Sequence, residues 1–193
     1  MIPLVVRQAS ANDFDLVSDI LAEVSLWLNE RGTPMWKADE LSAEQIAADV
    51  GAGLFFVGEF QGQPACVVKF QLEDTLFWPD ISQEKSAFIH RLAIRRRFSG
   101  GEVSSALLCW AAQRANALGR SFLRLDCEAS RPRLRAVYER LGFVHHSDRQ
   151  VGPYFVSRYE LDVTVAPHNE SSDPRPASGS SRTTHEPLQR QHG

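Results

Sequence analysis

The chain has 193 residues, of which 43% are hydrophobic and 23% are charged, and its net charge is −3. This length and balance predict one globular domain, and the slightly negative charge disfavours a nucleic-acid-binding protein, because such proteins carry a strongly basic face. The sequence has no signal peptide, and no apolar run approaches the ~20 residues of a membrane helix, so we expect a cytoplasmic protein without a membrane partner.

The three cysteines, Cys66, Cys109 and Cys127, are widely separated and form no CxxC pair. An odd number of cysteines without ligand spacing predicts neither a disulfide framework nor a zinc site. Each lies in an apolar run, so we interpret all three as small buried hydrophobic residues. His145 and His146 are adjacent on an expected strand and point to opposite faces, which disfavours chelation of one ion. We therefore expect no metal.

The first half of the chain predicts a strand, two helices and a hairpin. Asn12 or Asp13 is a candidate cap for the first helix, whose apolar residues recur at a helical period. A capping box from Ser42 to Gln45 starts the second helix, which ends near Gly51. The predicted elements are a strand at residues 4–7, helices at 12–30 and 42–51, and hairpin strands at 54–60 and 64–72.

The second half alternates strands with helices. Gly119 and Gly142 end two helical patterns. The predicted elements are strands at residues 87–94, 122–127, 143–147 and 154–161, and helices at 101–118 and 131–141. The order β-α-α-β-β-β-α-β-α-β-β predicts an α/β (α+β) domain whose mixed, mostly antiparallel central sheet is flanked by helices. Residues 166–193 are polar and contain no aromatic residue, so we expect a folded domain at residues 1–165 and a disordered tail.

A glycine-containing loop connects the strand at 87–94 to the following helix. Backbone N–H groups point out of the first turn of a helix, and the helix dipole favours negative charge there. Five small residues in this region allow a phosphate group to approach closely: Ser99, Gly100, Gly101, Ser104 and Ser105. Taken alone this pattern is weak, because glycines before a helix often only form a turn.

Two segments resemble the GNAT family of N-acetyltransferases. Residues 89–108, IHRLAIRRRFSGGEVSSALL, resemble its acetyl-CoA-binding segment, and residues 122–143, FLRLDCEASRPRLRAVYERLGF, resemble the segment that follows it. The resemblance implies a GNAT-like fold and transfer of an acetyl group from acetyl-CoA to a primary amine of a small molecule, amino acid or peptide. It also implies that the backbone of Leu92, Ala93 and Ile94 pairs with the pantetheine arm.

The phosphate-binding loop departs from the family pattern. At fixed spacing, Ser99 stands where the family has a basic residue or glutamine, Glu102 where it has its first motif glycine, and Ser104 at its last small position, with Val103 between them. A carboxylate at Glu102 is expected to weaken binding of a pyrophosphate unless it faces solvent. A second register instead begins at Arg97. The triple arginine at 95–97 could reach the phosphates or form a solvated loop.

A further departure lies at Arg131, because the family often has an asparagine at this position. We therefore expect Arg131 to alter one polar contact to the cosubstrate or to the reaction intermediate.

Acetyl transfer requires a base for the amine, a polarised carbonyl and an acid for the departing thiolate. The resemblance places Tyr138 as the acid, although its ring could instead only pack beneath the cosubstrate. A backbone N–H from residues 92–94 would polarise the carbonyl. His90 is the candidate base, with a structural role as the alternative, and Asp126 and Glu128 are further candidates. We expect direct attack in a ternary complex, since no cysteine occupies a convincing nucleophile position.

The acceptor pocket is expected between the early helices and the late strands. Trp36 and Trp78 lie in loops, where aromatic residues either line pockets or pack. Asp80 could attract an ammonium group, and residues 148–154 join two strands that flank the acceptor side in the family. A non-catalytic or other-acyl-CoA-binding sensor is the alternative function, motivated by Glu102. The sequence leaves a homodimer open.

Overall fold

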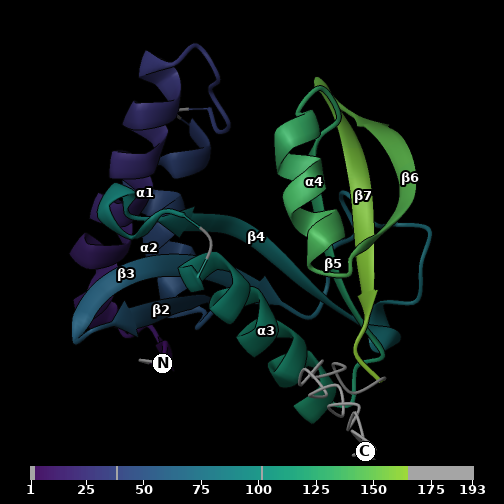
Figure 1. Ribbon diagram of the computed structural model, residues 1–193, viewed down its shortest axis with the longest axis horizontal. Coiled ribbons are helices and arrows are strands. Elements are labelled where there is room, and N and C mark those ends of the chain that lie inside the picture. The colour runs from purple at the N-terminus through teal and green to yellow at the C-terminus, as the bar shows by residue number, and fades with distance from the viewer. Residues whose placement is uncertain (1–2, 38, 101, 165–193) are drawn as a thin grey trace, which may run out of the picture.

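The computed structural model describes residues 3–37, 39–100 and 102–164, and its helices and strands follow the predicted order (Figure 1). Their bounds are β1 Val5–Gln8, α1 Phe14–Glu30, α2 Ala43–Gly51, β2 Phe55–Phe60, β3 Gln63–Gln71, β4 Ser86–Ile94, α3 Glu102–Ala117, β5 Phe122–Glu128, α4 Pro132–Arg140, β6 Val144–Val151 and β7 Tyr154–Asp162. The predicted tail at 166–193 lies outside the described residues. None of the described helices is long and apolar enough to cross a membrane.

The strands form one seven-stranded sheet in the order β1-β2-β3-β4-β5-β7-β6. Only β4 and β5 pair in parallel, and every other neighbouring pair is antiparallel. The expected mixed, mostly antiparallel sheet is therefore confirmed.

Local hydrogen bonds explain where the first two helices begin. Arg7 donates to both carboxylate oxygens of Asp13, at 2.7 and 2.9 Å, and the backbone N–H of Ser10 donates to the same carboxylate at 2.8 Å. These hydrogen bonds hold the pKa of Asp13 well below its usual range and tie the start of α1 to β1. At α2, the Ser42 hydroxyl accepts the backbone N–H of Gln45 at 3.3 Å, which confirms the predicted N-cap.

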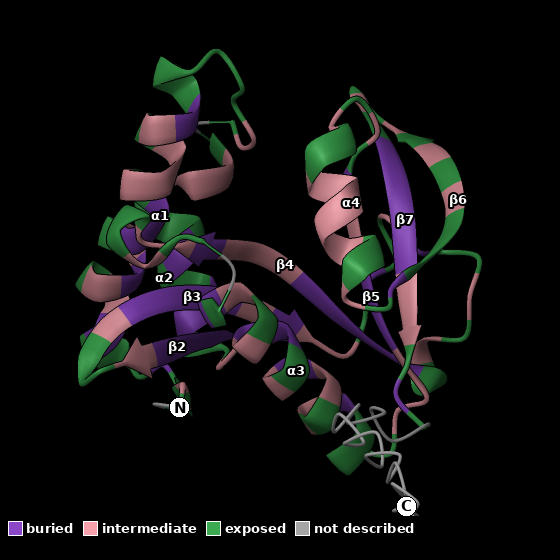
Figure 2. Ribbon diagram, viewed as in Figure 1, coloured by how far each residue is buried: buried purple, intermediate pink, exposed green. Residues whose placement is uncertain are grey.

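Apolar side chains cover both faces of the sheet. On β3, Cys66 and Val68 pack in the core beneath α3, whereas Val67 packs in the core beneath α1 and α2. Figure 2 shows this as long buried stretches in the central strands, interrupted in β4 by the half-buried residues 90–92, in contrast to α4, which has no buried residue. The expectation that all cysteines are buried is wrong for Cys109, which lies on the exposed side of α3, and correct for Cys66 and Cys127.

The parallel pairing of β4 with β5 is short. Only Ser86–Phe88 of β4 pairs with Phe122–Arg124 of β5, and beyond these residues the two strands diverge. Figure 1 shows the result: α1, α2 and β1–β4 lie on one side of the divergence, and β5, α4, β6 and β7 lie on the other. This divergence is the feature of the fold that positions the candidate site.

Candidate active site

A cleft of about 570 Å³ opens where β4 and β5 separate. Its walls come from β3, β4 and β5, from α4, and from the start of β7. The connection between α1 and α2 contributes Pro34, Met35, Trp36, Lys37 and Glu40. Segments far apart in the sequence therefore meet around one opening, as expected for a substrate-binding site.

A β-bulge shapes the β4 wall of the cleft. Val67 pairs with Ala93 and Lys69 pairs with His90, so the single residue between them on β3 faces both Arg91 and Leu92 on β4. Arg91 has a φ of +48°, a conformation that a side-chain-bearing residue rarely adopts. The bulge turns β4 away from β5 and leaves its backbone groups beyond Phe88 unpaired with that strand.

Leu92, Ala93 and Ile94 have different surroundings. Leu92 lines the cleft, Ile94 is half-buried, and Ala93 is buried in the core beneath α1 and α2. A contact from Ala93 to a ligand in the cleft would therefore be made by its backbone. The pairing of these three backbones with a pantetheine arm, which the resemblance implies, stays a prediction.

The predicted phosphate loop lies at the start of α3. Gly100 has a φ of +134°, which favours glycine, and the Ser99 hydroxyl donates to the carbonyl of Arg96 at 2.8 Å. Glu102 is the first residue of α3 and is exposed, whereas Val103 is buried in the core. Any contact from Val103 to an anion would therefore come from its backbone N–H. Gly101 lies outside the described residues.

Ser104 and Ser105 follow in the first turn of α3. Ser104 is half-buried and Ser105 is exposed. Their binding of phosphate stays a prediction.

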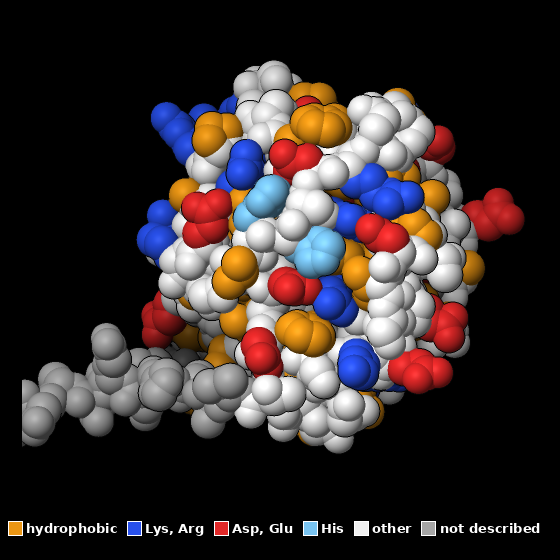
Figure 3. All heavy atoms as spheres, turned by 90° about the vertical axis from the view of Figure 1, so that its right-hand side faces the viewer, with side chains coloured by type: hydrophobic (Ala, Val, Ile, Leu, Met, Phe, Trp, Pro, Cys, Tyr) orange, Lys and Arg blue, Asp and Glu red, His pale blue; other side chains and the backbone are white. Residues whose placement is uncertain are grey.

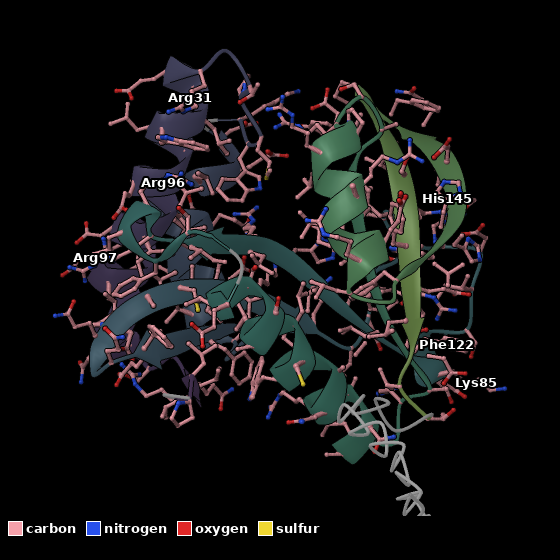
Figure 4. All side chains as sticks on the ribbon, viewed as in Figure 1. Arg31, Lys85, Arg96, Arg97, Phe122 and His145 are labelled. Carbon is pink, nitrogen blue, oxygen red and sulfur yellow. The ribbon has the colours of Figure 1, made fainter. Side chains whose placement is uncertain are left out.

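The triple arginine makes contacts with α1 and neighbouring aromatic rings. Arg95 Nη1 lies 2.5 Å from Glu23 Oε2, and the Arg96 guanidinium lies 3.6 Å from the centroid of the Trp27 ring. Arg97 stacks over Phe98 at 4.8 Å and is exposed. In Figure 4, Arg96 and Arg97 lie on the α1 side of the molecule. Arg95 and Arg96 are thus engaged with α1, and phosphate binding by Arg97 stays a prediction.

His90 lies between two carboxylates in the cleft. His90 Nε2 is 3.1 Å from Asp74 Oδ2, and His90 Nδ1 is 3.6 Å from Asp126 Oδ1. The side chains of Asp74, Asp126 and His90 are 4%, 11% and 19% exposed, so water reaches the imidazole more readily than either carboxylate. The closer contact does not meet the geometry of a hydrogen bond, and Asp74 Oδ2, His90 Nε2 and Asp126 Oδ1 are buried without a hydrogen-bond partner among the described residues.

The two carboxylates ionise differently. Burial raises the pKa of Asp126 to about 6. Burial also opposes ionisation of Asp74, but His90 and the backbone N–H groups of Leu76 and Phe77 outweigh it and hold the pKa of Asp74 below its usual value. Asp74 is thus the more strongly ionised partner of His90, and Asp126 takes up a proton more readily.

Tyr138 reaches the same cleft from α4. Its ring packs against Phe143 and Tyr159, with centroids 6.0 and 6.1 Å away, and burial raises the pKa of its phenol above the usual value. The hydroxyl therefore stays protonated at neutral pH. Because Tyr138 packs with the α3 core and His90 alternates with Ile89 of that core, the two side chains approach the opening from opposite faces of the sheet.

Arg131 bridges two walls of the cleft. Its Nε donates to Glu128 Oε2 at 2.8 Å, and its Nη2 donates to the carbonyl of Thr33 at 3.1 Å and to that of Pro34. Arg131 thereby connects the start of α4 to the segment that follows α1. The hydrogen bond from Arg131 holds the pKa of Glu128 below its usual value, which makes Glu128 a poor general base.

The other predicted acceptor residues divide into two groups. Trp36 lines the cleft, whereas Trp78 is fully buried beside Phe88 and lies in the core. Asp80 is unsuited to bind an ammonium group, because Arg158 lies 2.6 Å away and holds the pKa of Asp80 at about 2. His145 contacts Asp148 at 2.8 Å, and neither belongs to a group of possible metal ligands among the described residues.

The segment at 148–154 is shorter than expected as a connection. Strand β6 continues to Val151, and Gly152 and Pro153 form the turn into β7. Tyr154, the first residue of β7, donates its hydroxyl to Glu40 Oε1 at 2.9 Å and lines the cleft.

Asp74, Glu40 and Arg91 were not among the predicted site residues. The Arg91 guanidinium donates to the carbonyl of Glu40, and Asp74 contacts His90 from the connection between β3 and β4. No local motif marks these three residues. A hairpin alignment that pairs Lys69 with His90 would have indicated that the segment after β3 returns near the histidine.

Comparison with known proteins identifies the family. The family model for the acetyltransferase (GNAT) family matches residues 21–143. The chain belongs to this family. It is therefore an acyltransferase by class, and the resemblance inferred from residues 89–108 and 122–143 is confirmed.

An uncharacterized N-acetyltransferase, YesJ of Bacillus subtilis (strain 168), is 29% identical to this GNAT chain over 139 residues, which cover 68% of the chain and 76% of YesJ.

Solved structures share the GNAT fold. An acetyltransferase of the GNAT family from Listeria monocytogenes has a TM-score of 0.68 at 23% identity, with 82% of this chain and 95% of that chain covered. The aminoglycoside acetyltransferase AAC(6')-Ib, solved with paromomycin and acetyl-CoA, has a TM-score of 0.69 at 11% identity, with 89% and 99% covered. At these identities the likeness concerns the fold alone.

Proposed function

We propose that this GNAT protein transfers an acetyl group from acetyl-CoA to a primary amine by direct attack in a ternary complex. The observation that carries the proposal is the cleft between β4 and β5, which receives Tyr138 from one face of the sheet and His90 from the other. A thioester between two such groups would have a proton donor and a proton acceptor within one opening.

The residues around the opening fit acetyl-CoA. Beyond Phe88, β4 has backbone groups that do not pair with β5, and these could pair with the amides of a pantetheine arm. The first turn of α3, from Glu102 to Ser105, offers backbone N–H groups for a pyrophosphate. A backbone N–H near Leu92 would polarise the thioester carbonyl.

Direct transfer is favoured over an acetylated enzyme intermediate. Cys127 is the one cysteine among the residues that line the cleft, and burial raises its pKa to about 12. A thiol reacts as its thiolate, so this cysteine is a poor nucleophile at neutral pH. The acceptor nitrogen must therefore attack the thioester itself.

Two side chains carry the proton transfers in this proposal. Tyr138 protonates the departing thiolate, supported by its position on the cleft wall and by a phenol that stays protonated at neutral pH. His90 removes the proton from the amine. Asp126 is the other candidate base that lines the cleft, since Glu128 is held ionised by Arg131.

The acceptor is a small amine in this proposal. The cleft volume of about 570 Å³ must hold both the acetyl end of the cosubstrate and the acceptor, which favours a small molecule or a single side chain. The structural relative AAC(6')-Ib was solved with an aminoglycoside, so aminoglycosides belong in the substrate panel.

Calorimetry with acetyl-CoA on the full chain tests cosubstrate binding, and a panel of amines, amino acids, polyamines, peptides and aminoglycosides tests transfer by mass spectrometry. We expect binding and at least one acetylated amine. Binding without transfer to any amine would favour the sensor alternative. That alternative is based on the exposed Glu102 at the expected phosphate site. No binding at millimolar acetyl-CoA in a folded sample would contradict both functions.

We also propose a cytoplasmic location, since the described cysteines are all free thiols. Nucleic acid is not a proposed partner: on the face shown in Figure 3, acidic and basic side chains are interspersed. A homodimer stays open and is measured by light scattering.

A further inference from the structure

We propose that Asp74 is a positioning residue that fixes the tautomer of His90, and that Asp126 binds the ammonium group of the acceptor beside it. The inference rests on the proposed acetyl transfer and assigns separate tasks to the two carboxylates that flank the imidazole. Asp74, His90 and Asp126 come from three segments: the connection after β3, strand β4 and strand β5.

The two contacts of the imidazole are unequal. Asp74 Oδ2 is 3.1 Å from Nε2, and both atoms are buried without another partner among the described residues. Asp74 is also held in place by its Oδ1, which accepts the backbone N–H groups of Leu76 at 3.1 Å and Phe77 at 3.0 Å. An ionised carboxylate fixed in this way favours a proton on Nε2, so the lone pair of neutral His90 is on Nδ1.

Nδ1 faces Asp126 across 3.6 Å. An ionised Asp126 cannot donate to this nitrogen, and the separation is too long for a direct hydrogen bond. A group that carries several protons could satisfy both atoms at once. A primary ammonium has three N–H donors, so it can donate to Asp126 Oδ1 and to His90 Nδ1 together.

The pairing of other charged groups around the cleft makes Asp126 the candidate that binds the ammonium group. Lys69 is paired with Asp49 at 2.9 Å, and Glu128 is paired with Arg131 at 2.8 Å. Among the residues that line the cleft, Asp126 Oδ1 is a buried carboxylate oxygen without a hydrogen bond. An uncompensated buried carboxylate attracts a cation, and burial strengthens the attraction.

A metal ion explains the arrangement less well. Asp74, His90 and Asp126 offer ligand atoms within 4.8 Å of one another. However, Asp74 is close to Nε2 whereas Asp126 is close to Nδ1, on another edge of the ring. One ion can bind only one nitrogen of a given imidazole, so it could not use both short approaches.

The protons and bonds balance in this scheme. The ammonium of the acceptor gives its first proton to His90 Nδ1, which later releases it to solvent. The neutral amine then attacks the thioester carbonyl, so that a C–N bond forms and the C–S bond breaks. Tyr138 gives its proton to the sulfur and regains one from the nitrogen, which loses its second proton as the amide forms.

Nitrogen-15 NMR of His90 in the full-length protein tests the positioning role without any substrate. We expect the neutral ring to carry its proton on Nε2 in the wild type, and Asp74→Asn to shift the population toward the Nδ1–H form. Asp80→Asn is the matched control, because Asp80 lies in the same connection but pairs with Arg158 outside the cleft. A dominant Nδ1–H form in the wild type, or no change in Asp74→Asn, would overturn the proposal.

Kinetics with an amine found in the panel test both carboxylates. Asp74→Asn should lower kcat by roughly 10²-fold, within the range for general-base catalysis, and leave the Kd of acetyl-CoA unchanged. Asp126→Asn should raise the acceptor KM by about tenfold or more, again without a change in acetyl-CoA binding. An unchanged KM in Asp126→Asn would overturn the ammonium site.

The failures of the two proposals are distinguishable. A wild-type protein with the expected His90 tautomer that acetylates no amine would contradict the proposed transfer and the ammonium site, while the Asp74–His90 relationship would stand. Zinc added to the protein should leave the His90 spectrum unchanged. Stoichiometric binding of zinc that abolishes the Nε2–H signal would replace the proposal with a metal site.

Discussion

Lys69 lies directly opposite His90 in the pairing of β3 with β4, and its ammonium nitrogen is 2.9 Å from Asp49 Oδ2 on α2. Both side chains are largely buried, at 15% and 7% exposure. The carboxylate of α2 thus compensates a cation that would otherwise stand uncompensated beside the candidate base. This ion pair should stabilise the fold. It should also reduce the repulsion between Lys69 and the ammonium group of an acceptor.

Asp49→Asn should therefore lower Tm by about 3–10 °C, because the loss of one partner of such a pair costs on the order of 1–3 kcal/mol. It should also raise the acceptor KM, since the freed Lys69 repels an ammonium group. Differential scanning calorimetry and steady-state kinetics measure the two effects. The double variant with Lys69→Gln should recover most of both losses, and additive losses would contradict the coupling.

Tyr138→Phe should lower turnover by roughly 10²–10⁴-fold with little change in acetyl-CoA binding, because the ring packing is kept and only the phenol O–H is lost. Single-turnover kinetics and calorimetry measure the two quantities. Retention of more than about a third of the wild-type rate would mean that the thiolate takes its proton from another source.

Glu102→Gly should tighten acetyl-CoA binding if the carboxylate faces the pyrophosphate, since a like charge is removed from the first turn of α3. Glycine also weakens a helix, so Glu102→Gln serves as the control that removes the charge and keeps the helix propensity. Calorimetry gives the Kd of each variant. Weaker binding by both would indicate that Glu102 faces away from the phosphates or caps the helix.

Asp126→Asn should stabilise the protein more at high pH than at low pH. The pKa of Asp126 is raised to about 6, so the folded protein binds this proton more tightly than the unfolded chain does. Ionisation of Asp126 therefore lowers the free energy of unfolding as pH rises from about 4 through about 6. Amide substitution removes this loss.

Urea denaturation at pH 4 and pH 8 measures the effect of Asp126→Asn against the wild type. A gain at pH 8 that exceeds the gain at pH 4 by roughly 1–3 kcal/mol is the expected result. Equal effects at both values would mean that Asp126 ionises with its ordinary pKa.

Arg131→Asn introduces the residue that the family often has at this position. The variant loses the hydrogen bonds of Arg131 to Glu128 and to the carbonyls of Thr33 and Pro34. We expect faster amide exchange in residues 31–37, a raised acceptor KM, and an acetyl-CoA Kd that is unchanged or lower. Unchanged exchange in this segment would show that Trp36 and its neighbours hold the connection without the arginine.

Local patterns predicted most elements of the fold, because helix periods, caps and glycine stops act within a few residues. Strand β6 is longer than predicted, since Gly152, with a φ of +53°, permits a turn that lets pairing continue to Val151. Trp78 illustrates the limit for the core: its loop position left pocket lining and packing both open, and in the structure Arg158 and Phe88 enclose it.

The family resemblance selected two candidate residues that the structure brings to one cleft, and their catalytic roles stay predictions; residues that reach the cleft only through three-dimensional pairing were missed. Tyr138 and His90 belong to the two segments that carry the resemblance, and both line the cleft. Asp74 reaches His90 only because β3 pairs with β4. No residue near Asp74 in the sequence indicates this pairing. Likewise, the bridge from Arg131 to Thr33 spans 98 positions of the chain.

The short pairing between β4 and β5 is the only hydrogen-bonded connection between the two parts of the described sheet. Three residue pairs, Ser86–Phe88 with Phe122–Arg124, connect a four-stranded half to a three-stranded half. A ligand whose amides pair along the diverging edge of β4 would add hydrogen bonds beyond Phe88, as an additional strand does. The relative motion of the two parts of the sheet would then decrease. The cosubstrate would therefore stabilise the sheet while it is bound, in addition to donating the acetyl group.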